Sequence, residues 1–136
     1  MNIDWKGTRA PTLGDFEQIA EAAYRGLPGQ FLRLTGDIVI RISDLPDNDV
    51  LDELGIESPF DLLGLFQGLG LNSGPATPFT GQLPNAIWLY RRPILDYWAE
   101  HDESLGAIIA HVLIHEIGHH FGLSDDDMEA LEAAAD

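Results

Sequence analysis

One segment restricts the fold of this chain more than any other: residues 104–121 combine helical spacing with apolar side chains on nearly every face. The apolar residues of this segment are Leu105, Ile108, Ile109, Val112, Leu113, Ile114, Ile117 and Phe121. A surface helix keeps such residues in one stripe, whereas a helix that is apolar all round is buried. The rest of the chain is therefore expected to pack around this helix. Gly106 and Gly118 lower its helix propensity, and close packing against a sheet is their simplest explanation.

Shorter helices are expected on both sides of the buried one. Residues 12–27 have helical spacing, with Thr12 and Asp15 as a start signal and with Gly26 and Pro28 ending the helix. A single helical turn is expected near residues 50–54. Proline tolerates a first helical turn, so Pro93 can open a short helix through Trp98. Ser124 can cap a final acidic helix that runs through Met128 and Leu131.

Strands are expected at residues 37–42, 60–67 and 86–90. The first of them places three isoleucines on one face, which is the period of a strand. Gly64 in the second permits close approach of another backbone, or else marks a bulge. Residues 71–85 hold three prolines and two glycines with little periodicity, and are expected to form a surface loop.

Composition limits the classes of partner. The chain has 136 residues, which fits one domain (residues 1–136), and its formal net charge is −16. After Arg92 there are eleven Asp or Glu residues and no Lys or Arg. Such a field repels phosphate backbones, so no nucleic-acid partner is expected, and cationic substrates are favoured over anionic ones. No apolar run is long enough for a membrane span and no signal peptide is apparent, so a soluble, cytoplasmic protein without a membrane partner is expected.

Metal chemistry is indicated at the end of the buried helix, where the sequence reads HEIGHHFGLSD. His115 and His119 are four residues apart, so both imidazoles lie on one helix face and can bind one zinc ion at about 2.0–2.1 Å. The chain has no cysteine, so nitrogen and oxygen are the available ligands. Glu116 can take a proton from metal-bound water without replacing that water. The alternative is two histidines satisfied inside a core helix, but an acidic Glu116 buried there would need a partner or a task.

The third ligand is less well defined by the residues alone. Gly122 falls where a left-handed glycine usually ends a helix, and the chain can turn back beneath the ion. Asp125 follows as a third ligand, yet Asp126, Asp127 and Glu129 offer the same chemistry, and the sequence leaves this choice open.

Other residues near the motif have simpler interpretations. A ligand at His111 would lie about 6 Å up the helix from His115, so His111 is excluded from the site and expected to be a partner of a ligand or a core histidine. His120 is rotated about 100° from His119 and is expected to point away from the ion, as a favourable group near the helix end. Met128 is expected to be a packing residue.

The longer pattern HExxHxxGxxD resembles the metzincin signature, with aspartate in place of the third histidine. Three further segments contribute to a family resemblance. They are LPNAIWLYRRPI (Leu83 to Ile94), LLGLFQG (Leu62 to Gly68) and the opening helix that ends in a Leu27-Pro28 step. Together they are similar to the bacterial "possible zincin" family of minimal metallopeptidase-like domains. The resemblance covers the chain from about Phe16 to Met128.

This resemblance implies a minimal zincin-like α+β domain. A small mixed sheet of about three to four strands would pack on an N-terminal helix and a buried active-site helix, with a C-terminal helix following. It also implies one zinc ion per chain on His115, His119 and Asp125, with Glu116 as the catalytic base.

The function implied is that of a zinc metallopeptidase, a hydrolase acting on a peptide or protein substrate. Tyr90, Tyr97 and Arg92 are candidates for a second donor to the oxyanion. Zincins generally bind an extended substrate along a sheet edge, and residues 60–67 are the expected edge. The alternative is a non-catalytic zinc-binding partner or regulatory protein that retains the scaffold. So small a chain leaves little room for a second cleft wall, so a partner protein could complete the cleft.

Overall fold

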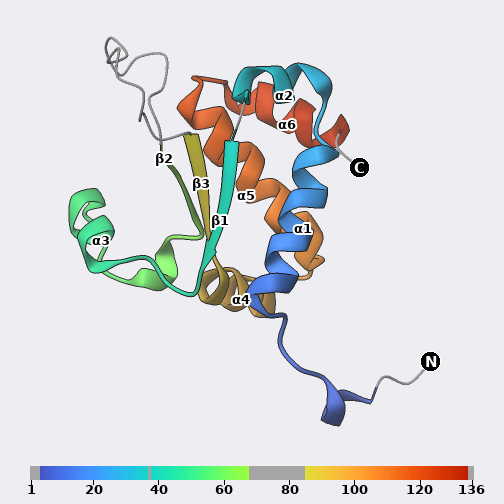
Figure 1. The fold of residues 1–136 in the computed structure, drawn as a ribbon, viewed down its shortest axis with the longest axis vertical. Helices are drawn as coiled ribbons and strands as arrows, with labels where there is room; N and C mark the ends of the chain where they lie inside the picture. Colours follow the sequence, from blue (N-terminus) through green and yellow to red (C-terminus); the bar gives the residue numbers. More distant parts are fainter. Residues whose placement is uncertain (1–3, 37, 68–84, 135–136) are drawn as a thin grey trace.

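The computed structural model describes residues 4–36, 38–67 and 85–134 (Figure 1). In chain order the elements are the 3-10 turn η1 (Trp5–Gly7), α1 (Leu13–Arg25), α2 (Gly29–Thr35), β1 (Ile38–Ser43), α3 (Asn48–Leu54), the 3-10 turn η2 (Pro59–Asp61), β2 (Gly64–Gln67), β3 (Asn85–Tyr90), α4 (Arg91–Glu100), α5 (Leu105–His120) and α6 (Asp125–Ala134). The expected α+β class is confirmed. The loop expected at residues 71–85 lies outside the described residues, except that Asn85 begins β3.

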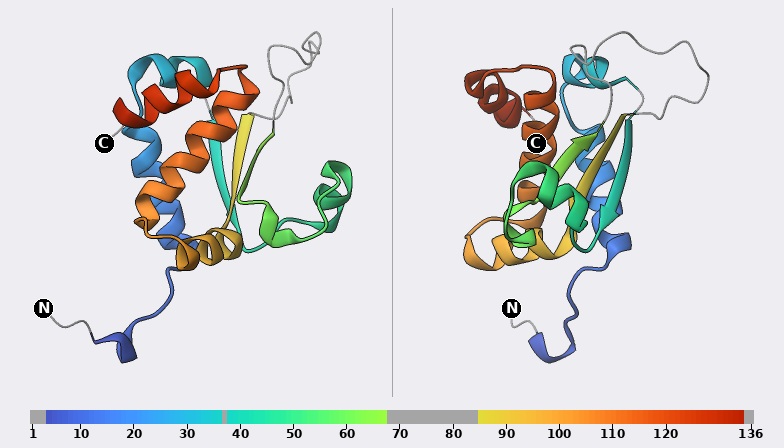
Figure 2. Two further views of the ribbon diagram at one scale, coloured as in Figure 1. Left: turned by 180° about the vertical axis from the view of Figure 1, so that it is seen from behind. Right: turned by 90° about the vertical axis from the view of Figure 1, so that its left-hand side faces the viewer.

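The sheet is mixed and has the order β1-β3-β2. β3 pairs in parallel with β1, with Ile40 beside Ile87, and antiparallel with β2, with Phe66 on the other side of Ile87. Two turned views show α1 and α5 together on one side of this sheet, and α3 standing away from them (Figure 2). Among the described strands β2 is therefore an edge strand, and it packs against α5 at Gly64 and Phe66.

α5 forms the centre of the core, as its sequence predicts. Ile109, Leu113, Ile114 and Ile117 have no exposed surface. Phe16 of α1 is fully buried in the same cluster. Burial of a large apolar side chain stabilises the folded state by about 1.5–3 kcal/mol. Packing against the surrounding elements is therefore the main source of stability for α5.

Two expected boundaries are corrected by the structure. The first helix does end at Gly26, but Pro28 is then the N-cap of a second short helix, α2. Its carbonyl accepts hydrogen bonds from the Phe31 and Leu32 amides, and Phe31 is buried there. The strand expected at residues 60–67 begins only at Gly64. Phe60 and Asp61 belong instead to η2, where the Ser58 hydroxyl accepts a hydrogen bond from the Phe60 amide at 3.2 Å.

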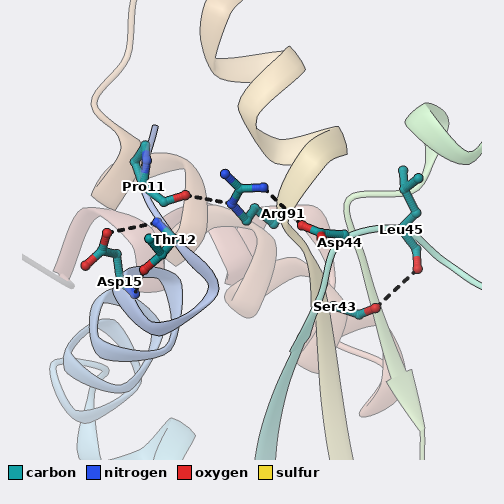
Figure 3. A network of polar contacts seen from close by, with 7 residues as sticks. All are labelled: Pro11, Thr12, Asp15, Ser43, Asp44, Leu45 and Arg91. Atoms are coloured by element: carbon teal, nitrogen blue, oxygen red, sulfur yellow. Dashed lines mark hydrogen bonds and ion pairs between the residues drawn. The ribbon is translucent and has the colours of Figure 1, made fainter. Parts of the chain in front are cut away.

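A network of polar contacts joins the start of α1 to the junction of sheet and α4 (Figure 3). Thr12 and Asp15 form the predicted start signal as a reciprocal capping box. Arg91 donates to the Pro11 carbonyl at 2.6 Å and to the Asp44 carboxylate at 3.0 Å. One side chain thus holds the segment before α1 against the residue that follows β1.

The two glycines of α5 differ from the expectation that both pack against the sheet. A Cβ at Gly118 would lie 2.8 Å from Met128 Cγ and closer still to its sulfur, so this close contact is with α6. A Cβ at Gly106 would meet nothing within 4 Å. Close approach to the sheet occurs instead at Gly64, where a Cβ would lie 2.6 Å from a Val112 methyl carbon and 3.1 Å from the Trp88 carbonyl oxygen.

Among the described residues, no helix has both the length and the apolar character of a membrane span.

Candidate metal centre and cleft

The turn between α5 and α6 brings two helices with ligand side chains together. Gly122 has a φ of 74°, and the Leu123 amide donates to the Gly118 carbonyl at 2.8 Å, which is the predicted Schellman ending. Ser124 then caps α6 by accepting from the Asp127 amide at 3.1 Å. Because the turn is this tight, α6 returns along α5, and Met128 is fully buried against Gly118, in agreement with its expected packing role.

The two histidines of the motif lie one turn apart, on the last turns of α5. The centroids of the His115 and His119 rings are 6.0 Å apart. His115 is half-buried, His119 is exposed, and Asp125 is exposed at the first position of α6. Within the described residues, neither His119 nor Asp125 belongs to a group whose three ligand atoms already lie within bonding range of one ion.

The group that the structure does bring together consists of His111, His115 and Glu132, whose ligand atoms all lie within 4.8 Å of one another. One carboxylate oxygen of Glu132 is 2.5 Å from His111 Nδ1, and the other is 3.4 Å from His115 Nε2. The His111 and His115 rings are tilted by 31° to each other, with centroids 4.0 Å apart.

This arrangement revises the sequence interpretation of His111. The side chain is 50% exposed, so it is not a core histidine. The rise of one helical turn separates its backbone from that of His115, but side chains at i and i+4 incline toward each other and the two rings touch. Its spacing before His115 is a visible signal in the sequence. Glu132, in contrast, cannot be found without the geometry of the α5–α6 turn.

A cavity of about 290 Å³ opens beside the histidines. It is lined by His111, His115 and Glu116 of α5, by Tyr97 of α4, and by residues around the start of β2. Burial raises the pKa of the Glu116 carboxyl above its usual value, and the nearby His119 partly opposes that rise. An acidic group that holds its proton more tightly than usual, at the wall of a cavity, is suited to accept and release protons.

The three candidates for a second oxyanion donor differ in their position relative to this cavity. Tyr97 is among its lining residues. Tyr90 is 3% exposed in the sheet, and burial together with the negative Asp47 raises its pKa to about 12. Arg92 lies instead over the ring of Phe60, in a different hollow.

His120 faces the sheet and not the ligand histidines. Its ring stacks on Phe66 of β2 with centroids 3.9 Å apart, and its Nε2 is buried without a hydrogen-bond partner among the described residues. Burial lowers the pKa of His120 below its usual value. It packs against β2, and its lowered pKa disfavours the charged form that the expected interaction with the helix end requires.

The donor set fits zinc. Imidazole nitrogen and carboxylate oxygen are both ordinary zinc ligands, and three protein ligands with one open position are typical of catalytic sites. The described residues place three imidazoles along one face of α5 and carboxylates on the facing α6. More ligand groups are thus gathered along these two helices than one ion requires.

Comparisons with known proteins concern the fold and the family of this chain. One solved structure, of a conserved hypothetical protein from Thermus thermophilus, is similar with a TM-score of 0.52 and 24% sequence identity, over 80% of this chain and 92% of that one. That likeness concerns the fold. No curated protein matches the chain. The family model for zincin-like metallopeptidases matches residues 35–135, which include the whole HExxH segment and α6. The chain therefore belongs to the zincin-like metallopeptidase family.

Proposed function

We propose that this protein is a zinc-dependent peptidase that hydrolyses peptide bonds, with zinc held by His115, His119 and Asp125 and with Glu116 as general base. The observation that carries the proposal is the position of Glu116. Glu116 lines the same cavity as His115, and burial has raised the pKa of its carboxyl. A site that only stores or senses zinc has no need of such a group next to its ligands.

The residues divide the chemistry between them. When bound, zinc would supply a water of lowered pKa, toward about 7, and would polarise the substrate carbonyl. The Glu116 carboxylate takes one proton from the attacking water as its oxygen bonds to the carbonyl carbon. Glu116 then gives that proton to the amide nitrogen as the carbon–nitrogen bond breaks. Water has been added across the peptide bond, and Glu116 is again ionised.

Tyr97 is the proposed second donor to the developing oxyanion. It is the one of the three sequence candidates that lines the cavity with His115 and Glu116. Its ring stacks on His101 with centroids 3.7 Å apart, which limits its rotation. A donor held in place before the reaction stabilises developing charge without a reorganisation cost.

The proposed substrate is an extended peptide that adds to the edge of β2 that pairs with no other described strand. β2 pairs with β3 on one side, and Leu63 and Gly64 at its start line the cavity. Main-chain hydrogen bonds to an edge strand give affinity in this mode of recognition. Asp61 and Glu103 line the same cavity, so peptides with Lys or Arg near the scissile bond are the first to test.

The deciding experiment compares the wild-type protein with Glu116→Gln. Both are loaded with zinc, analysed for metal content, and assayed against a peptide library with and without a chelator. We expect Glu116→Gln to keep its zinc and its fold and to lose hydrolysis by about 10²–10⁴-fold, the usual effect of losing a general base. Chelation should abolish wild-type cleavage.

Two outcomes would contradict the proposal. Equal rates in the wild type and in Glu116→Gln would assign the cleavage to a contaminating protease. A zinc-loaded wild-type protein that cleaves nothing in a broad library, but retains a partner protein only when zinc is present, would favour the non-catalytic zinc-binding function.

A further inference from the structure

We propose that the chain has a second metal position, formed by His111, His115 and Glu132, that excludes the catalytic one because both need His115. The inference rests on the proposed function only in assigning the other position to His115, His119 and Asp125. Its occupant would be a late first-row divalent cation such as Zn²⁺, Co²⁺ or Ni²⁺, because imidazole and carboxylate ligands suit these ions.

The first argument is the placement of the three ligands. Both oxygens of Glu132 are directed to imidazole nitrogens, one to His111 Nδ1 at 2.5 Å and one to His115 Nε2 at 3.4 Å. A tetrahedral ion with ligands at about 2.0–2.2 Å keeps its ligand atoms about 3.3 Å apart. The group already lies within 4.8 Å, so an ion can be accommodated by small side-chain rotations on two otherwise fixed helices.

The second argument is access. The side chains of His111, His115 and Glu132 are 50%, 27% and 29% exposed, so an ion can enter from solvent. His111 and His115 also line the cavity, which leaves room for water as a further ligand. Among the described residues, the ion-pair partners of Glu132 are His111 and His115.

The two positions cannot be filled together. A neutral imidazole has a free lone pair on one nitrogen only, and Nε2 of His115 faces Glu132, so an ion bound at Nε2 leaves no second lone pair on this ring. Metal between His111 and Glu132 therefore withdraws His115 from the set that includes His119. In this position the ion sits one turn up α5, away from His119, and hydrolysis at the proposed centre is suppressed.

The test uses His119→Ala, which breaks the catalytic set and leaves the second one intact. Co²⁺ is the probe, because its visible absorption reports binding, and zinc content is measured in parallel. We expect His119→Ala to bind one Co²⁺ per chain. Adding His111→Ala or Glu132→Gln to His119→Ala should weaken that binding at least 10-fold, whereas adding Glu53→Gln, an exposed carboxylate of α3, should not change it. Circular dichroism checks that each variant is folded.

Three results would overturn the inference. The first is a folded His119→Ala that binds no metal. The second is metal binding by His119→Ala that His111→Ala leaves unchanged, which would mean that Glu132 only orients His115. The third is a wild-type protein that holds two tightly bound ions per chain. These results are independent of the peptidase assay, because a protein whose cleavage depends on Glu116 could give any of them.

Discussion

At the scale of single residues, replacing the two glycines of α5 by alanine should change the stability of the protein in opposite directions. At Gly118 a Cβ would lie 2.8 Å from Cγ of the fully buried Met128 and closer still to its sulfur. Gly118→Ala should therefore destabilise the protein by about 1–3 kcal/mol through overpacking. Gly106→Ala has open space and reduces the entropy of the unfolded chain, so it should stabilise by about 0.4–1 kcal/mol. Denaturant unfolding of the two variants measures both effects, and equal changes would contradict this difference in packing.

The two tyrosines near the sheet can be separated by kinetics. Tyr97→Phe removes the proposed oxyanion donor and should lower kcat by about 10²-fold with little change in KM. Tyr90→Phe is the comparison, because Tyr90 is buried away from the cavity, and it should leave kcat near the wild-type value. The reverse pattern would assign the donor to Tyr90.

Tyr90 also has a consequence for alkaline stability. Its pKa is raised to about 12, chiefly by burial and then by Asp47, so its charged form is disfavoured in the folded state. A folded pKa above the unfolded value of about 10 means that stability is complete below pH 10 and falls as the pH rises toward 12. Tyr90→Phe should lose this part of the pH dependence. An unfolding free energy that falls equally in both proteins over that range would contradict the assignment.

At the scale of elements, the α5–α6 turn controls how the ligand groups meet. Gly122 adopts a φ of 74°, which costs another residue about 1–2 kcal/mol. Gly122→Ala should destabilise by about that amount and weaken metal binding, because α6 no longer returns along α5 in one register. Hydrogen exchange should show α6 amides opening before those of α5. Wild-type metal affinity in a folded Gly122→Ala would show that the turn does not position the ligands.

The turn also illustrates what sequence reasoning can and cannot provide. α1, α5, α6, β1 and β3 are predictable, because their caps, glycines and apolar periods are local signals. α2 escapes prediction because Pro28 reads equally well as the end of one helix and as the start of another. The position of Glu132 depends on a contact between helices, 17 residues from His115, and no local pattern reports it. The motif can thus define the catalytic hypothesis but not the group that the fold assembles.

At the scale of the whole molecule, metal should stabilise the fold by mass action. Any ion held by His115 and a carboxylate of α6 links the last two helices, and free metal at a hundredfold above its Kd contributes about 2.7 kcal/mol. Chelation should lower the Tm and expose α6 first. The buried part of α5 should remain folded, since Ile109 and Leu113 are covered by protein and not by the ion. Calorimetry with and without chelator measures this, and either an unchanged Tm or complete unfolding would contradict it.

The central position of β3 determines when the sheet can form during synthesis. In the described part of the chain, β1 and β2 each pair with β3 and not with each other. Both outer strands therefore leave the ribosome before the strand that joins them, and remain unpaired until residues 85–90 emerge. A fragment ending at residue 84 should give no sheet signal by infrared spectroscopy, although α1 within it keeps its own capping box. Unpaired strands are prone to aggregate, so the nascent chain is most in need of a chaperone over this interval.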